Sequence, residues 1–375
     1  MEGIKLSGRG WTPKLHWAGM GRSLISIVVT VLAAVGSGHA QWQMQVSRTT
    51  ANLRGIHAVN SNVAWASGAQ GTVLRTEDGG SQWTKCTVPA GAEKLDFRGV
   101  WAWDANTAIV MSSGPGEQSR LYKTVDGCRH WSEEARNTEK DGFWDAVVFD
   151  PEDFGTAGAG KTGVLLGDPL RGLFDTHLML TSHGWAVETA PCAAREGEAA
   201  FAASNSSVFV FGPRRYIIVT GGKLGARALL SPLLAGNNTA KACQEIPLPL
   251  DGGADSTGAF SVAFRDPKHG VVVGGDYKKP DDPSGTAAWT SDGGLHWTAA
   301  SQPPRGYRSA VAWDTEAEVW IAAGTSGSDM SRDDGKTWKS LEDGNWNALS
   351  LPYVVGPGGR IGKVLSASGA LPLSH

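Results

Sequence analysis

One pattern of eight residues, called the octet below, returns four times along this chain. Each octet has Thr or Ser first, Asp third, glycine at the fourth or fifth place and Trp eighth. The copies are Thr76–Trp83, Thr124–Trp131, Thr290–Trp297 and Ser331–Trp338, with a degenerate copy at Thr181–Trp185. The Asp accepts backbone N–H bonds within a tight turn, and glycine allows positive φ. The octet therefore predicts a repeated hairpin whose Trp begins the next strand. We interpret its Asp and Trp residues as structural: Asp78, Trp83, Asp126, Trp131, Asp292, Trp297, Asp333 and Trp338.

Two further strand signals lie upstream of each octet. Before the first octet, 55–59 and 63–66 alternate in polarity, and 72–75 is rich in β-branched residues. The same frame starts again at roughly 40 to 60-residue spacing. Its seven starts are Arg54, Arg98, Asp145, Glu198, Phe260, Arg308 and Trp346. Each interval has room for four short antiparallel strands.

The ends of the chain complement each other. The last repeat, 345–365, holds three strand signals and no octet, whereas 42–47 resembles the strand that follows an octet elsewhere. We therefore predict an all-β, seven-bladed β-propeller of four-stranded antiparallel blades, closed when the N-terminal strand completes the last blade. A single closed ring makes 41–375 one domain.

Composition agrees with a folded β-protein. The 50 glycines, 18 prolines and 16 tryptophans occur without a long helix-forming run. A formal charge of −3 gives no sign of a nucleic-acid partner.

The first forty residues have the features of a signal peptide. A basic region precedes the apolar run 24–35, and small residues lead to a cleavage site after Ala40. Met20 is an alternative start. We expect 1–40 to be removed and the mature chain to be periplasmic or secreted, with no membrane span.

Four cysteines are expected to form disulfides in such a compartment. Cys86 follows the first octet and Cys128 lies within the second, so a bond between them is plausible. The pairing of Cys192 and Cys243 stays open. No spacing matches a metal site, and we expect no cofactor.

The octet is the Asp-box pattern, and the chain resembles the photosystem II stability/assembly factor family within the Asp-box (BNR) propellers. The resemblance rests on the octets, on the Phe-rich strand 260–265 and on three glycine-containing segments, 269–275, 306–312 and 355–361. It implies a periplasmic or lumenal propeller that binds a protein partner, such as a membrane-protein subunit, during assembly. We expect such a binder to be a monomer.

Functional residues should gather where the chain enters the first strand of each blade, since rigid blades there hold exposed loops. Arg54, Arg98 and Arg308 would ring the channel mouth and hold a carboxylate or an acidic peptide. In the alternative interpretation these arginines pair structurally with Asp145, Asp168 and Glu198. The partner-binding candidates are Arg54, Arg98, Arg308, Tyr307, Asp145, Asp168, Arg171, Glu198, Asp276, Tyr277 and Lys278.

Two enzyme classes are weaker alternatives. A glycoside hydrolase of the sialidase type could use Tyr307 and Arg308 with two carboxyls among Asp145, Asp168, Glu198 and Asp276, but Arg54-Gly-Ile replaces the Arg-Ile-Pro expected in the first blade. An oxidoreductase finds less support, because no glycine run opens a helix that would hold a dinucleotide. We therefore predict a non-catalytic binding protein.

Overall fold

The computed structural model describes residues 42–150, 162–180, 185–187, 191–212, 215–232 and 243–364, so the predicted signal peptide and most of the degenerate octet lie outside the described residues. These ranges contain β-strands and two short 3-10 turns, η1 (Gly116–Gln118) and η4 (Pro357–Gly359). The prediction of an all-β chain is confirmed. No helix in these ranges is long and apolar enough to cross a bilayer.

We number the strand positions within each sheet from first to fourth, starting with the innermost strand. The first strands are β2 (Leu53–Ala58), β6 (Phe97–Ala102), β10 (Trp144–Phe149), β15 (Val208–Gly212), β19 (Thr257–Phe264), β23 (Ala310–Asp314) and β27 (Ala348–Ser350). The second strands are β3 (Ala64–Gly68), β7 (Ala108–Ser112), β11 (Thr162–Leu170), β16 (Arg215–Gly222), β20 (Gly270–Asp276), β24 (Val319–Gly324) and β28 (Tyr353–Val355). The third strands are β4 (Thr72–Thr76), β8 (Arg120–Thr124), β12 (Leu173–Leu180), β17 (Arg227–Leu230), β21 (Ala287–Thr290), β25 (Gly327–Ser331) and β29 (Ile361–Val364). The fourth strands are β5 (Thr84–Lys85), β9 (Ser132–Arg136), β13 (Trp185–Val187), β18 (Gln244–Pro247), β22 (Thr298–Ala299), β26 (Lys339–Glu342) and β1 (Trp42–Gln45).

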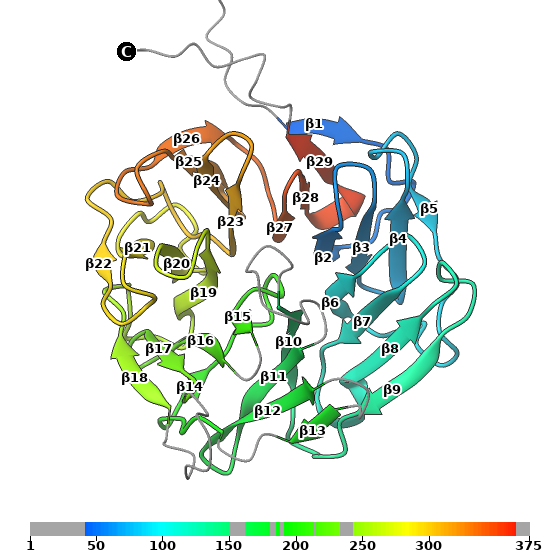
Figure 1. The fold of residues 1–375 in the computed structure, drawn as a ribbon, viewed down its shortest axis with the longest axis horizontal. Coiled ribbons are helices and arrows are strands. Elements are labelled where there is room, and N and C mark those ends of the chain that lie inside the picture. Colours follow the sequence, from blue (N-terminus) through cyan, green and yellow to red (C-terminus); the bar gives the residue numbers. More distant parts are fainter. Residues whose placement is uncertain are drawn as a thin grey trace, which may run out of the picture. The chain divides into compact units, whose positions relative to one another are not determined.

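Every pairing between these strands is antiparallel. Within the described ranges five sheets have four strands, and a sixth has nine, because the backbones of Gly221 and Gly258 join β16 to β19. A Cβ on Gly221 would stand 2.4 Å from the Thr257 carbonyl oxygen, so only glycine allows this approach. The predicted four-stranded antiparallel sheets are thus confirmed (Figure 1).

The first strands contact one another in chain order, and β2 also contacts β27. Strand β1 pairs with β29, as Trp42 lies opposite Val364. Trp42 is buried, and its indole N–H donates to Ser328 Oγ at 3.0 Å. The earliest described strand therefore completes the sheet of the last three strands.

Burial follows strand position. The second strands β3, β7, β20 and β24 are buried at every residue, whereas the fourth strands β5 and β22 are exposed. Apolar clusters fill the space between neighbouring sheets. One of them joins Trp65 of β3 to Phe97 of β6 and Tyr122 of β8. A strand covered on both faces needs a nearly continuous apolar run, which is why these short strands can be read from the sequence.

The four octets fold into the same turn. In the first, the Thr76 hydroxyl donates to Asp78 Oδ1 at 2.9 Å, and the Gly80 and Gln82 N–H groups donate to Thr76 Oγ1 and Asp78 Oδ1. The same three bonds recur in the other octets. Cys128 takes the place of Gly80 in the second octet, with a φ of 65°. The Thr or Ser and the Asp side chains of each octet thus form hydrogen bonds within the turn itself.

Two disulfides join neighbouring parts of the described chain. Cys86–Cys128 links the end of β5 to the second octet, and Cys192–Cys243 links the segment before β14 (Glu198–Ala199) to the start of β18. Both bonds tie together segments that are distant in sequence.

The predicted fourth start, at Glu198, lies on the short strand β14 and is separated from the longer first strand. Glu198 and Ala199 pair with Gly222 and Gly221, but the first strand proper, β15, begins at Val208. Residues Ala200–Ser207 leave the ladder between the two strands, and we call them the plug loop.

Candidate functional site

The side chains at the mouth of the first strands are set by β-bulges. The register of β2, β6, β10 and β19 shifts by one residue at Arg54, Arg98, Asp145 and Phe260. A bulged residue is left out of the ladder, and its side chain is redirected. Arg308 and Asn347 stand just before β23 and β27 in the same frame. We call the side of the sheets that carries these residues the mouth face, and the side that carries the octet turns the octet face.

The plug loop lies among the first strands of several sheets. Asn205, with a φ of 63°, accepts the Val147 N–H at 2.7 Å, and its amide donates to the carbonyls of Val147 and Val100. Ser204 donates to the Ser309 carbonyl at 2.6 Å, and Ser206 donates to Ser261 Oγ at 2.7 Å. These bonds reach β6, β10 and β19 and the residue before β23. The loop therefore supplies partners for backbone groups of strands that face one another.

The plug loop also positions two of the predicted arginines. Arg54 Nη2 and Arg98 Nη1 both donate to the Ala202 carbonyl, at 3.3 and 3.4 Å. Arg98 forms an ion pair with Asp96 at 2.8 Å. Among the residues that the structure describes, no carboxylate forms an ion pair with Arg54, and its Nε is buried without a partner. Burial and the nearby Arg98 guanidinium lower the pKa of Arg54. Arg54 thus has unused hydrogen-bonding capacity at the mouth.

Two predicted binding residues are instead buried in ion pairs. Arg308 is fully buried, and its Nε donates to Asp329 Oδ2 at 2.6 Å. Glu198 accepts from Arg227 and from the Thr220 hydroxyl, and it is also buried. The expectation that Arg308 and Glu198 face a partner is therefore wrong, because each is occupied by a partner from a third strand. The alternative pairing of the arginines with Asp145, Asp168 and Glu198 is wrong as well.

A cluster of aromatic side chains lies beside Arg54. The Phe201 ring of the plug loop stacks on Phe260 at 3.8 Å, and the Tyr307 ring meets Phe260 edge-on at 4.8 Å. Tyr307 is buried, and this burial raises the pKa of its hydroxyl, whereas Tyr277 is 45% exposed beside the same rings. The mouth face therefore offers an apolar shelf with one accessible ring.

The remaining polar candidates lie around this shelf. The Lys278 ammonium lies over the Tyr277 ring, and the Lys278 N–H donates to Asp276, which is buried at the end of β20. Arg171, at the exposed turn between β11 and β12, forms an ion pair with Glu139 at 3.2 Å. Asp276 thus has a turn-forming role, and Lys278 remains accessible.

Asp145 and Asp168 are brought together on paired strands. Asp145 is 1% exposed, and its pKa lies well above the usual value because of burial and then the Asp168 charge. Burial also raises the pKa of Asp168 to about 6, opposed by a hydrogen bond from the Ala200 N–H. One oxygen of each carboxyl group is buried without a partner. Neither of these two acids forms an ion pair with a described cation.

A pocket of about 660 Å³ opens on the mouth face beside Asp168. Its wall comes from the turn after β11, the segment before β14 and the turn after β16. The lining residues are Asp141, Asp168, Pro169, Gly172, 194–199, Gly222 and Asp255. Five of its side chains are acidic, and Arg195 is its basic one. The pocket therefore favours positive charge.

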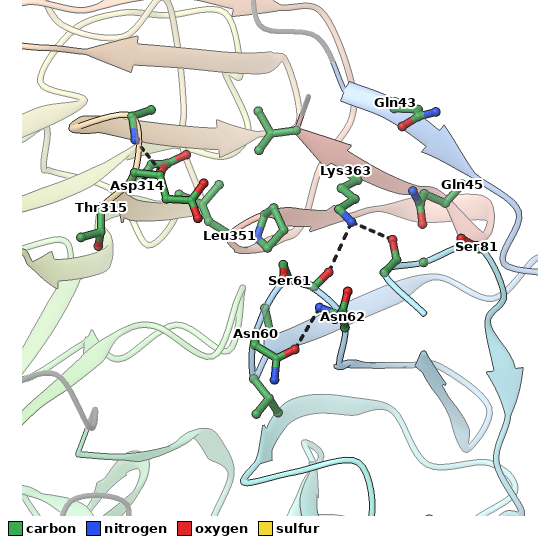
Figure 2. A pocket seen from close by; sticks show the side chains of 18 of the residues that line it. Gln43, Gln45, Asn60, Ser61, Asn62, Ser81, Asp314, Thr315, Leu351 and Lys363 are labelled. Atoms are coloured by element: carbon green, nitrogen blue, oxygen red, sulfur yellow. Dashed lines mark hydrogen bonds between the residues drawn. The ribbon is translucent and has the colours of Figure 1, made fainter. Parts of the chain in front are cut away.

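A larger pocket, of about 1210 Å³, opens on the octet face between β1, β29 and the turns of neighbouring sheets. Figure 2 shows Lys363 donating to the Ser61 and Gly79 carbonyls, and Asn60 accepting the Asn62 N–H. Its polar groups thus already bond the turns to one another. Unlike the mouth, this pocket has no buried carboxyl oxygen without a partner among its described lining residues.

Neither a family model nor a curated protein matches the sequence. Solved structures do match. One structure described as YCF48 bound to D1 peptide is 14% identical, with a TM-score of 0.56 over 87% of this chain and 97% of that one. YCF48 from Cyanidioschyzon merolae is 16% identical, with a TM-score of 0.56 over 86% and 98%. The WD40 β-propeller domain of Doa1 is 8% identical, with a TM-score of 0.57 over 90% and 100%. The chain has the β-propeller fold.

Three residues of the sialidase alternative are engaged within the protein. Arg308 and Glu198 are held in the buried ion pairs, and Tyr307 is packed against Phe260. In the described ranges no cluster of His, Cys, Asp and Glu is suited to a metal ion. The sequence analysis missed the plug loop, whose signal was the run of small residues Ala199–Ser207 interrupted by Phe201.

Proposed function

We propose that this propeller is an exported, non-catalytic protein that binds a partner protein on its mouth face, with Arg54 as the main contact for a carboxylate. The observation that carries this proposal is the Arg54 guanidinium, which bonds to one backbone carbonyl and forms no ion pair with a described residue. Planar guanidinium groups bind carboxylates through two parallel hydrogen bonds. Arg98 adds positive charge beside it.

The neighbouring aromatic shelf fits the same role. Tyr277 is exposed above buried Phe260 and Tyr307, and tyrosines with one apolar and one polar end are common in protein interfaces. YCF48, which shares the fold, has been seen with a D1 peptide bound. By analogy, the partner of this chain is a peptide segment of another protein, and a photosystem II factor-like assembly role is the most specific form of the proposal.

We further propose seven blades with a closed ring. Counting the nine-stranded sheet as two blades gives one blade for each first strand, with β14 as the displaced start of the fourth. The pairing of β1 with β29 and the contact of β2 with β27 support closure. Closure leaves no first-strand sheet edge for a partner, so binding would use loops and side chains.

Export is part of the proposal. The two disulfides support it, since disulfide bonds persist in oxidising compartments. The predicted cleavage after Ala40 gives a mature chain that begins at Gln41. N-terminal sequencing of the exported protein tests this, and a mature chain that retains 1–40 in the reducing cytosol would contradict it.

The binding proposal is tested with three bait proteins whose net charges differ by at most one unit. They are the unmodified mature chain, Arg54→Gln, and Arg332→Gln, which removes an exposed arginine of the octet face. After cross-linking in intact cells, we expect one partner to be recovered with the unmodified chain and with Arg332→Gln, and to be lost with Arg54→Gln. Equal recovery by both variants, or no partner with any bait, would contradict binding through this face.

A further inference from the structure

Asp145 and Asp168 lie at bulges on the paired strands β10 and β11. Asp145 is left out of the β10–β11 ladder and Asp168 is left out of the β11–β12 ladder. The Asp168 N–H donates to the Phe143 carbonyl at 2.8 Å, so the two residues lie on opposite sides of the Trp144–Gly167 pair. Their carboxyl groups still interact, because the Asp168 charge raises the pKa of Asp145.

Among the described residues no cation forms an ion pair with either carboxyl group, and the Arg98 charge acts on Asp145 without such a contact. Asp145 Oδ2 and Asp168 Oδ1 are both buried with no hydrogen-bond partner. An unpartnered buried carboxyl oxygen is costly, and two adjacent carboxyls cannot both be ionised without repulsion. Asp175, the next nearest acid, differs because it accepts from the Trp144 indole and from His177. A positively charged hydrogen-bond donor would therefore stabilise the pair.

Asp168 also lines the mouth-face pocket, so a ligand can reach it from solvent. Asp145 lies beside it and outside the pocket wall. Of the other acids lining the pocket, Glu198 is neutralised by Arg227 and Asp255 pairs with Lys223. The basic lining residue, Arg195, pairs with Glu245. Asp141 and Glu196, which form no described ion pair, leave the pocket negative together with Asp168.

We propose that the pocket is a subsite for a basic side chain, arginine or lysine, of the bound partner, with Asp168 as its direct contact and the buried Asp145 carboxyl group behind it. This inference rests on the proposed function, because it assigns a second chemical requirement to the same partner. Arg54 takes a carboxylate, and the acid pair takes a cation. The bound segment therefore carries charges of both signs in a fixed order.

Binding at this subsite depends on pH. The charged groups facing the pair are Arg98 from β6, Asp175 with His177 from β12, and the pocket residues Asp141, Arg195, Glu196, Glu198 and Asp255. Because burial raises the pKa of Asp168 to about 6, the carboxyl is largely protonated below that pH and ionised above it. A cation binds the ionised form, so binding strengthens as the pH rises through 6 and releases protons near that pH.

The test is a calorimetric titration of the mature chain with two blocked peptides. The first is acetyl-(Gly-Arg)3-Gly-amide, and the second has citrulline, the neutral analogue of arginine, in place of each Arg. Titrations at pH 5, 6 and 7, in two buffers that differ in ionisation enthalpy, measure affinity and proton release. Asp168→Asn is the test variant. Glu316→Gln, which removes an exposed acid of the octet face, is the matched control.

We expect the arginine peptide to bind the unmodified chain and Glu316→Gln alike, with proton release near pH 6. Asp168→Asn should weaken it about tenfold or more and remove the pH dependence, and the citrulline peptide should not bind. Equal binding of the two peptides, unchanged binding by Asp168→Asn, or no binding of the arginine peptide to the unmodified chain would overturn the inference. Thermal unfolding of Asp168→Asn shows whether it is folded, and if it is not, Glu196→Gln, which removes an exposed acid of the same pocket, replaces it, and unchanged binding by that variant overturns the inference. Arg54→Gln should leave this titration intact while losing the cross-linked partner, which separates failure of the subsite from failure of the proposed function.

Discussion

Asn205 is the residue through which the plug loop is bonded to two neighbouring sheets. Its side chain accepts the Val147 N–H at 2.7 Å and donates to the Val147 carbonyl at 2.9 Å, with a longer bond to Val100 at 3.4 Å. Val147 is fully buried, and Asn205 is 9% exposed. Asn205→Gly removes all three bonds and keeps the positive φ of 63° without strain.

The expected loss of stability follows from the groups left behind. A buried backbone donor or acceptor without a partner costs about 1–3 kcal/mol. Two such groups on Val147 predict that Asn205→Gly lowers the free energy of unfolding by roughly 2–6 kcal/mol. Asn205→Ala should lose about 1 kcal/mol more, because alanine is strained at positive φ. The difference between the two variants therefore separates backbone strain from lost hydrogen bonds.

Urea unfolding at pH 7, followed by tryptophan fluorescence with the disulfides intact, measures both variants. Asn106→Gly, at an exposed turn, is the matched control and should stay within about 0.5 kcal/mol of the unmodified chain. If Asn205→Gly also stays within that range, water satisfies Val147 and the reasoning about the plug loop is refuted.

Three further predictions concern the same fold. Trp42→Ala should lower the free energy of unfolding by about 3–5 kcal/mol in urea, because a buried indole that bonds to Ser328 is lost; a smaller effect than an exposed-site substitution would contradict the role of β1. His57 has its pKa lowered by burial to about 4, so the folded chain loses stability as the pH falls from about 6.5 towards 4, by up to about 3 kcal/mol. His57→Phe should remove this part of the acid sensitivity, and equal urea midpoint shifts between pH 7.5 and 4.5 for both chains would count against it. Arg308→Met should cost about 3–5 kcal/mol, because the buried Asp329 carboxylate then keeps only its longer ion pair with Arg305 at 3.9 Å, and adding Asp329→Leu should restore part of that loss in thermal unfolding; no restoration would mean that the charge is not the cause.

The repeating local chemistry was predictable from the sequence. The octet bonds involve residues at most four apart, so the pattern itself specifies the turn. The frame also placed Arg54, Arg98, Asp145 and Phe260 at equivalent positions, and these became the bulged residues.

The predictions that failed concern residues whose partners lie far away in the sequence. Arg308 is neutralised by Asp329 on the third strand of its own sheet, and Glu198 is neutralised by Arg227 in the same way. No local pattern distinguishes such an arginine from Arg54. The plug loop was missed because its bonds run to β6, β10, β19 and the residue before β23, and a run of small residues does not identify such distant partners.

The pairing of β1 with β29 makes the fold sensitive to the completeness of the chain. During synthesis β1 emerges among the first described residues, but the strand that it pairs with is made last. A chain cut short before Ile361 leaves the β1 edge unpaired and Trp42 without its neighbours in the last sheet, and such edges and apolar surfaces are what chaperones and proteases recognise. Closing this sheet therefore requires the chain to be made at least as far as β29, so a product that ends earlier keeps an exposed strand edge.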